Sequence, residues 1–311
     1  MVRPLEPDDG LAHAVTQVMG DTIDRWQPVA GGFSSAGLWV IETSGAVRRF
    51  VKAANTQDTA RFLRAEKVVY DQIDAQFMPE VEAWVDDLEY PFLIIEDLSD
   101  SHWPPPWSAG DIDAVLSVFE EIASTPPPTG LSNEALSALA ESFWPRIAAD
   151  VEPVQSLGVA SAAWFEQALP HLIAAENTAV VTGDHLVHAD IRSDNLCIGD
   201  RVKIVDWNWA SVGNPMLDVV AWLPSLRLEG GPPPWELVTD EVGLVARLAG
   251  FFLQHATRPR SPYVRADIRD SQRAQGAVAL EWAAVELGLP PPEPARKTNL
   301  DLPQSGSPTC P

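Results

Sequence analysis

Residues 188–195 read HADIRSDN, and residues 202–207 read VKIVDW. The first stretch places Asp190 and Asn195 five residues apart, and Asp206 follows Asp190 by sixteen residues. Two short apolar runs with a glycine-containing turn between them separate Asn195 from Asp206, which predicts a β-hairpin. Because a hairpin returns the chain beside itself, we expect the three polar side chains to converge.

Such a set of oxygen-bearing side chains suits one kind of chemistry. Mg²⁺ prefers oxygen ligands, and proteins usually hold it with one or two carboxylates together with waters and substrate phosphates. Phosphoryl transfer by kinases uses a loop Asp for the acceptor hydroxyl, and a loop Asn with a following Asp for the metal ions. The order Asp190, Asn195 and Asp206 therefore favours phosphoryl transfer.

The first third of the chain, residues 1–97, reads mainly as strands around one helix. β-prone runs separated by turn residues predict an antiparallel five-strand sheet with strands at 25–31, 38–42, 47–53, 81–86 and 91–95. The helix is expected at 56–74, where Glu66 falls on the same face as Phe62 and Val69. A carboxylate among apolar side chains needs a partner, because an unpaired buried charge is expensive.

The remainder of the chain changes to a helical pattern. Helices are expected at 111–124, 133–150, 162–176, 216–226, 236–255 and 265–287. We therefore predict an α+β, bilobal fold with an N-terminal sheet lobe (1–97) and a larger, mainly helical C-terminal lobe (98–290), joined at about 96–101. The tail, 291–311, is rich in proline and polar residues and is expected to be disordered. Ligands commonly bind between two such lobes.

The motif residues also resemble the signature of a known family. The aminoglycoside phosphotransferase (APH) family has a signature that approximates His-Gly-Asp-x-x-x-x-Asn, then Ile-Asp-Trp, then Gly-x-Pro-x-x-Asp. The matching residues here are His188, Asp190, Asn195, Asp206, Trp207 and the stretch 213–218, which reads GNPMLD. The sequence departs from the usual pattern at Ala189, Arg192 and Asn208. Weaker features extend the likeness over residues 25–290.

The resemblance implies a protein-kinase-like fold and a role for each motif residue. Asp190 is expected to act as the catalytic base, and Asn195 and Asp206 to hold Mg²⁺. His188 and Asp218 are expected to orient and support the loop rather than to react.

The same template places a phosphate-binding lysine on the third strand, with a glutamate partner on the next helix. Lys52 lies at the end of that strand, next to its last residue, and Glu66 already needs a partner. The alternative is that Lys52 is exposed on the strand and Glu66 is a solvated acid of the helix. The other expected nucleotide contacts are Gly31, Gly32, Ser34, Ser35, Glu96 and Leu98. The glycine pair also suits an ordinary hairpin turn, and Glu96 and Leu98 would contribute backbone groups only.

Composition excludes several classes of protein. The 311 residues include 21 Lys and Arg against 44 Asp and Glu, a net charge of −23, so we expect no binding to nucleic acid or to an anionic membrane. No apolar run approaches the roughly 18 residues of a membrane span, and no secretory signal is evident, which predicts a cytoplasmic protein. Two cysteines are too few for a disulfide framework.

We therefore expect ATP-dependent, Mg²⁺-dependent phosphorylation of a small-molecule hydroxyl. The acidic stretch 98–218, with 17 acids and 4 bases, favours a cationic ligand, unless those acids only coat the surface. The scaffold suits an aminoglycoside, an amino sugar, a macrolide or a related metabolite. The alternative is a nucleotide-binding pseudokinase with a regulatory role, which predicts a missing Lys, Asp or Asn. A protein-substrate kinase is disfavoured because Asp-Phe-Gly and Ala-Pro-Glu segments are absent, and the sequence carries no signal for an oligomeric state.

Overall fold

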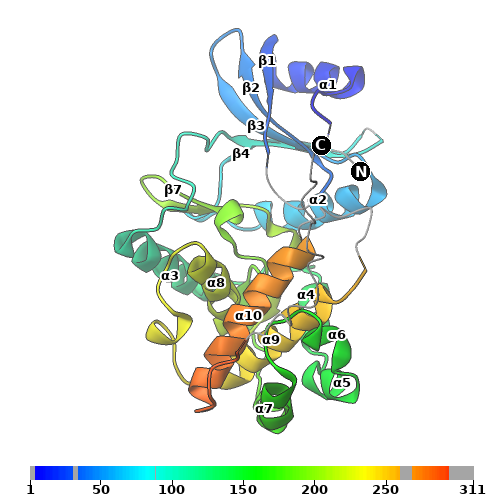
Figure 1. Ribbon diagram of the computed structural model, residues 1–311. Helices are drawn as coiled ribbons and strands as arrows, with labels where there is room; N and C mark the ends of the chain where they lie inside the picture. Colours follow the sequence, from blue (N-terminus) through cyan, green and yellow to red (C-terminus); the bar gives the residue numbers. More distant parts are fainter. Residues whose placement is uncertain (1–3, 31–33, 88, 260–267, 294–311) are drawn as a thin grey trace, which may run out of the picture.

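The structure, a computed structural model, describes residues 4–30, 34–87, 89–259 and 268–293. Figure 1 shows a lobe built on a sheet above a larger lobe built mainly of helices, so the expected bilobal α+β fold is confirmed. The tail expected at 291–311 lies, from 294 onward, outside the described residues.

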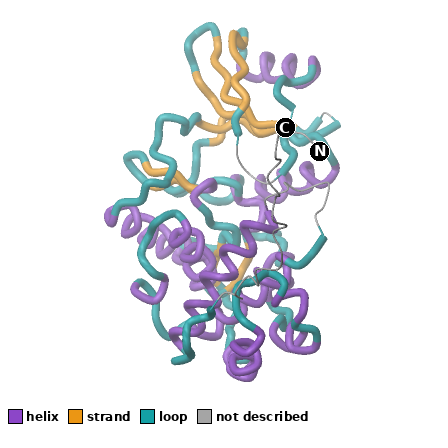
Figure 2. Tube along the Cα trace, in the orientation of Figure 1, coloured by secondary structure: helices purple, strands orange, loops and turns teal. Residues whose placement is uncertain are grey.

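The N-terminal lobe contains the expected five-strand antiparallel sheet (Figure 2). Its strands, in the spatial order β1-β2-β3-β5-β4, are β1 (Ile23–Pro28), β2 (Gly37–Thr43), β3 (Arg48–Ala53), β5 (Phe92–Glu96) and β4 (Val81–Val85). Alternate side chains of β5 enter two different cores: Phe92 and Ile94 pack on one face of the sheet, and Leu93 and Ile95 on the other. The sheet is therefore buried on both faces.

The prediction of one helix in this lobe was incomplete, because a second helix, α1 (Asp9–Met19), precedes the sheet. The Asp8 side chain caps it by accepting a hydrogen bond from the Leu11 amide at 2.8 Å, and Gly20 ends it in the left-handed region at φ 64°. Leu11 and Val15 alone are buried, and they pack on the sheet face of Phe92. Two buried positions make a weak periodic signal, which is why the sequence pattern did not reveal this helix.

Helix α2 (Gln57–Tyr70) covers the opposite face of the sheet. Thr56 begins it with a reciprocal cap to Thr59. The helix ends four residues before the expected limit of 74, but its predicted apolar face is present, since Glu66, Val69 and Ile73 are buried. The periodicity thus placed Glu66 correctly in the interior.

The C-terminal lobe packs its helices around one large apolar core. The helices are α3 (Ala109–Ser124), α4 (Glu134–Leu139), α5 (Trp144–Ala149), α6 (Glu152–Gln155), α7 (Ala162–Glu176), α8 (Met216–Leu228), α9 (Val242–Ala256) and α10 (Ile268–Glu286). The core includes four tryptophans that are fully buried: Trp144, Trp207, Trp222 and Trp282. Most of the tryptophans near the motif therefore stabilise the fold rather than line a pocket.

Two of the expected helices have different limits. The helix expected at 133–150 is divided into α4 and α5, because Pro145 lies in the first turn of α5 and cannot occupy a helix interior. The buried Glu176 carboxylate accepts hydrogen bonds from the Phe143 and Trp144 amides, at 2.8 and 3.0 Å, and so satisfies that helix start. The helix expected at 236–255 begins only at Val242, after the short 3-10 turn η3 (Pro234–Glu236).

Short strands position the motif between the helices. β7 (Leu196–Ile198) and β8 (Val202–Ile204) form the expected hairpin, and the 3-10 turns η1 (Ser193–Asn195) and η2 (Trp207–Trp209) flank it. β6 (His185–Val187) pairs with β9 (Ser211–Gly213), which closes the segment that contains the motif. A Cβ at Gly183 would lie 2.3 Å from the Gly213 carbonyl oxygen, so the close approach of these backbones requires glycine.

Asp21 joins the start of β1 to the turn between β2 and β3. Its carboxylate accepts hydrogen bonds from the Ser44 hydroxyl and from the Gly45 amide, the latter at 2.9 Å. These bonds, the Ser44 bond first, lower the pKa of Asp21 to about 2. The ionised carboxylate is therefore favoured more in the folded chain than in the unfolded chain.

We expect Asp21→Asn to lower the urea midpoint of unfolding at pH 7. Since the pKa of the folded state lies below that of the unfolded state, the stabilisation is present above about pH 4 and is lost as the pH falls toward 2. The difference from the wild type should therefore narrow in urea titrations between pH 7 and pH 3. Asp24→Asn, an equal change of charge at an exposed position of β1, is the control, and equal pH dependence in both variants would contradict the assignment.

Candidate active site

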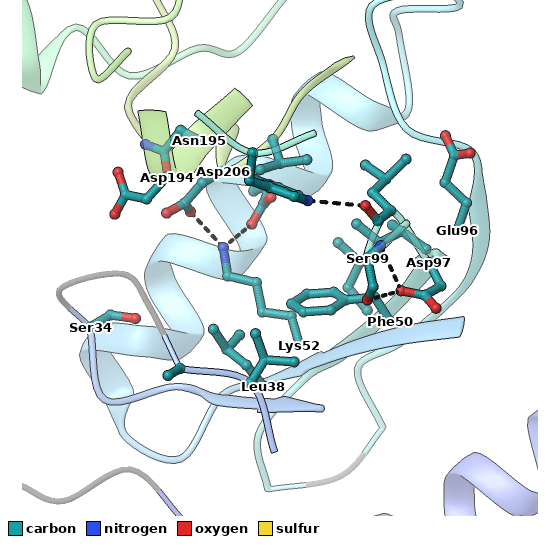
Figure 3. A pocket seen from close by; sticks show the side chains of 18 of the residues that line it. Ser34, Leu38, Phe50, Lys52, Glu96, Asp97, Ser99, Asp194, Asn195 and Asp206 are labelled. Atoms are coloured by element: carbon teal, nitrogen blue, oxygen red, sulfur yellow. Dashed lines mark hydrogen bonds and ion pairs between the residues drawn. The ribbon is translucent and has the colours of Figure 1, made fainter. Parts of the chain in front are cut away.

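A cavity of about 460 Å³ lies between the sheet lobe and the hairpin of the C-terminal lobe (Figure 3). Apolar side chains from the sheet, among them Leu38 and Phe50, form one side of it. Asn195, Val205 and Asp206 form part of the opposite side. An apolar slot that ends in convergent polar groups is the usual form of a small-molecule site.

Lys52 lies at the polar end of this cavity, between two carboxylates. Its Nζ donates to Glu66 Oε2 at 2.7 Å and to Asp206 Oδ1 at 2.5 Å (Figure 3). The ion pair expected between Lys52 and Glu66 is thus present, and the contact with Asp206 connects the two lobes. The side chains of Lys52 and Glu66 are only 15% and 2% exposed, so each charge depends on the other.

Burial and charge act in opposite directions on these three groups. Burial alone would lower the pKa of Lys52, but Asp206 and then Glu66 outweigh it and raise that pKa above its ordinary value. Burial raises the pKa of Glu66, although Lys52 opposes the change. For Asp206 burial acts to raise the pKa, but Lys52 outweighs it and the pKa lies below its ordinary value. The lysine thus stays charged and keeps Asp206 ionised.

Asp190 lies beside the cavity rather than in its wall. The side-chain nitrogen Nδ2 of Asn195 donates to the main-chain carbonyl oxygen of Asp190 at 2.8 Å, which holds the two motif residues together. Arg192 forms an ion pair with the Asp190 carboxylate and also bonds Asp194 Oδ1 at 2.9 Å. Burial raises the pKa of Asp190 to about 6 even though Arg192 opposes the change, and the side chain remains 29% exposed. A carboxylate in this range is suited to proton acceptance near neutral pH.

Backbone hydrogen bonds fix the loop that carries Asp190. Asp218, in the first turn of α8, accepts from the amides of His188 and Ala189 at 2.7 and 2.8 Å. The His188 ring bonds the Val205 carbonyl oxygen at 3.0 Å and is fully buried. Ala189 has a φ of 63°, in the left-handed region that favours glycine. That conformation explains why the family usually has glycine there, and the Asp218 bond helps to hold the alanine in it.

Glu96 and Leu98, whose backbone groups were expected to contact the nucleotide, also make hydrogen bonds within the protein. Glu96 Oε1 accepts from the Glu80 amide at 2.9 Å and from Lys203 Nζ at 3.0 Å, so this side chain links the lobes. The Leu98 carbonyl oxygen accepts from Trp103 Nε1 at 3.0 Å. Glu96, Leu98 and Trp103 all line the cavity. Sequence reasoning missed Trp103, because only the folded connector brings it beside the slot.

The glycine-rich turn is described only in part. Gly31 and Gly32, two of the expected phosphate contacts, lie outside the described residues. Ser34 lines the cavity. Ser35 is instead held by Asn55, whose side-chain nitrogen Nδ2 donates to the Ser35 carbonyl oxygen at 2.5 Å. Asn55 was not expected at the site, and it connects this turn to Thr59, in the first turn of α2.

The donor atoms at the cavity suit a magnesium ion bound with a phosphate. Asp206 offers a carboxylate and Asn195 an amide oxygen, both hard oxygen donors of the kind Mg²⁺ prefers. No group of three or more His, Cys, Asp and Glu side chains that could hold a metal occurs within the described ranges. The two donors therefore fit an ion that takes its other ligands from phosphates and water, rather than one enclosed by the protein alone.

The chain also matches the model of a known protein family. The model of the phosphotransferase enzyme family (APH) matches residues 25–241, which is more than half of the chain. The chain belongs to this family. This APH-family protein is accordingly a member of a family of phosphotransferase enzymes, as the motif predicted.

Solved structures with a similar fold include three small-molecule kinases or phosphotransferases. A protein described as a fructosamine-3-kinase, from Haemophilus somnus, is 14% identical with a TM-score of 0.48, covering 86% of this chain and 96% of its own. An aminoglycoside phosphotransferase from Streptomyces rimosus, in complex with ADP and streptomycin, is 15% identical with a TM-score of 0.45, covering 88% and 99%. A macrolide 2'-phosphotransferase from Brachybacterium faecium is 14% identical with a TM-score of 0.47, covering 90% of each chain. No curated protein matches the APH-family chain.

Within the part of the chain that the structure describes, no helix has the length and apolar character needed to cross a bilayer.

Replacement of Lys52 by Met should destabilise the fold in a pH-dependent way. The change leaves the Glu66 carboxylate buried without its cation, which we expect to reduce the free energy of unfolding by about 3 kcal/mol at pH 8. In the variant Lys52 no longer opposes the effect of burial, so the pKa of Glu66 should rise further above its unfolded-state value than in the wild type, and the loss should grow as the pH rises from 5 to 8. Urea unfolding across this range measures it.

The double variant Lys52→Met, Glu66→Gln is the matched control, because it removes the uncompensated charge. It should recover part of the lost stability at pH 8 and show a weaker pH dependence. A double variant as unstable as Lys52→Met at pH 8 would show that the ion pair does not account for the loss.

Proposed function

We propose that this protein transfers the γ-phosphate of ATP to a hydroxyl group of a small molecule and requires Mg²⁺ for the reaction. The observation that carries the proposal is the placement of Lys52 between Glu66 and Asp206 at one end of the cavity, with Asn195 beside it. This set offers a cation for phosphates and oxygen donors for a metal within one slot.

Each polar residue has a distinct part in the proposed reaction. The Lys52 ammonium binds phosphate oxygens, and Glu66 holds that ammonium in place. Asn195 and Asp206 would hold Mg²⁺, which supplies charge neutralisation for the phosphates when it is bound. The protein contributes alignment and electrostatic stabilisation instead of covalent chemistry.

Asp190 orients the acceptor and takes its proton. The hydroxyl donates a hydrogen bond to the Asp190 carboxylate, which directs the oxygen lone pair toward the phosphorus. As the new O–P bond forms, the hydroxyl proton passes to Asp190 and ADP leaves with the electrons of the broken O–P bond. With a pKa of about 6, Asp190 is mostly ionised at pH 7 and above, so it can accept this proton.

For the acceptor we propose a hydroxyl compound that carries positive charge, such as an aminoglycoside, an amino sugar or an amine-bearing macrolide. The support is electrostatic, because residues 98–218 contribute 17 acids and only 4 bases. Such an excess of carboxylates favours the approach of a cation. The Asp190 side chain is also 29% exposed, so an acceptor has access to it.

Asp190→Asn should abolish most phosphate transfer while leaving the fold intact. Loss of a positioned proton acceptor typically lowers kcat by about 10²–10⁴-fold, whereas ADP binding should persist because Asp190 does not line the cavity. Asp206→Ala should lose both transfer and Mg²⁺-dependent binding of ADP. ADP release across a panel of hydroxyl acceptors, with ADP affinity from calorimetry, provides the measurement.

Asp113→Asn, at an exposed position of α3, is the control and should match the wild type. Full activity of purified Asp190→Asn would refute the base assignment. Tight binding of ATP and Mg²⁺ by the wild type, without transfer to any member of a broad acceptor panel, would favour the regulatory pseudokinase instead.

A further inference from the structure

Tyr70, the last residue of α2, lies where the cores of the two lobes meet. Its side chain packs against the apolar cluster between α2 and the sheet, which includes Leu63 and Leu93. It also packs against the large core of the C-terminal lobe, to which Val69 belongs. This packing accounts for the aromatic ring of Tyr70, but a phenylalanine ring would fill the same space. The hydroxyl group therefore needs a separate explanation.

The Tyr70 hydroxyl bonds a group that the proposed mechanism uses. It donates to Glu66 Oε1 at 3.1 Å, while Glu66 Oε2 accepts from Lys52 at 2.7 Å. One carboxylate thus receives the tyrosine on one oxygen and the lysine on the other. Tyr70 follows Glu66 by four residues on the same helix, so the helix itself sets this alignment. Lys52 Nζ also donates to Asp206 Oδ1 at 2.5 Å, so a chain of contacts runs from Tyr70 through Glu66 and Lys52 to Asp206.

Asp206 needs support of this kind because its backbone is in an unusual conformation. Its φ and ψ are 68° and 53°, the left-handed region that residues other than glycine rarely adopt. Such a conformation persists only where the surroundings fix it. Lys52 holds the side chain of Asp206, and Tyr70 in turn holds Glu66, the other partner of Lys52. This support comes from the N-terminal lobe and acts on a residue of the C-terminal lobe.

We propose that Tyr70 is a positioning residue whose hydroxyl holds the Glu66 carboxylate in line with Lys52 and, through Lys52, with Asp206. The bond keeps Lys52 and Asp206 in the one arrangement that suits a nucleotide. Tyr70 itself touches neither phosphate nor acceptor. This inference rests on the proposed function for its kinetic consequences, but the contact can be tested without any substrate.

The first experiment measures the contact in the apo protein. Tyr70→Phe removes the hydroxyl and keeps the ring, and Tyr90→Phe is the matched control because Tyr90 packs against the same sheet-side cluster. We expect hydrogen exchange at the Asp206 amide, followed by NMR, to be at least about fivefold faster in Tyr70→Phe than in the wild type or in Tyr90→Phe. Equal exchange in all three proteins would overturn the inference.

The second experiment measures the effect on the site. A lost hydrogen bond to a charged group should reduce kcat/KM for ATP by about tenfold in Tyr70→Phe, and weaken ADP binding by a similar factor, with no change in Tyr90→Phe. If Tyr70 acts through Glu66, the same substitution in a Glu66→Gln background should change ADP affinity by less than about threefold. A purely structural role predicts equal losses in both backgrounds, and that result would overturn the inference.

The two experiments separate failure of this inference from failure of the proposed function. A wild type that neither binds nucleotide nor releases ADP would refute the proposed function, while faster exchange at Asp206 in Tyr70→Phe would still support the contact. An active wild type whose exchange at Asp206 and whose ADP affinity are unchanged by Tyr70→Phe would refute the role of Tyr70 alone. Faster exchange with unchanged ADP affinity in an active enzyme would also refute it.

Discussion

The arrangement of the site depends on one buried cation. The ammonium of Lys52 is removed from most of the solvent, and it is stable there because Glu66 and Asp206 supply opposite charge from two directions. Lys52 and Asp206 are 154 residues apart in the chain and belong to different lobes. The requirement to neutralise one charge therefore brings a strand of the sheet, helix α2 and the end of the hairpin into contact. The cavity exists because these three elements meet there.

Much of this arrangement could be predicted because it depends on local sequence patterns. Helical periodicity alone placed Glu66 in the interior, where it needs a counter-charge, and the resemblance to the family indicated Lys52 as its partner. The hairpin between Asn195 and Asp206 follows from two apolar runs and a glycine-containing turn. The alternation of side chains across β5 likewise follows from strand geometry. In each case the deciding physical property repeats over a few residues.

The features that sequence reasoning missed depend on contacts between distant segments. Asn55 has ordinary local surroundings, and only folding brings its side-chain nitrogen to the carbonyl oxygen of Ser35, twenty residues earlier in the chain. The division between α4 and α5 depends on Pro145 together with a carboxylate more than thirty residues away. The Glu96 side chain bonds Lys203, in the other lobe, and the main-chain amide of Glu80. No periodic pattern records such pairings.

The way in which Asp218 holds the catalytic loop has a consequence for evolution. Asp218 bonds the amides of His188 and Ala189, groups that every residue except proline possesses. The path of the main chain before Asp190 is therefore fixed by a partner in α8, not by the identities of residues 191–194. Side chains in that interval can be exchanged without loss of this anchor. Substitutions there can thus alter the surroundings of the Asp190 carboxylate while the main-chain path that leads to it is kept.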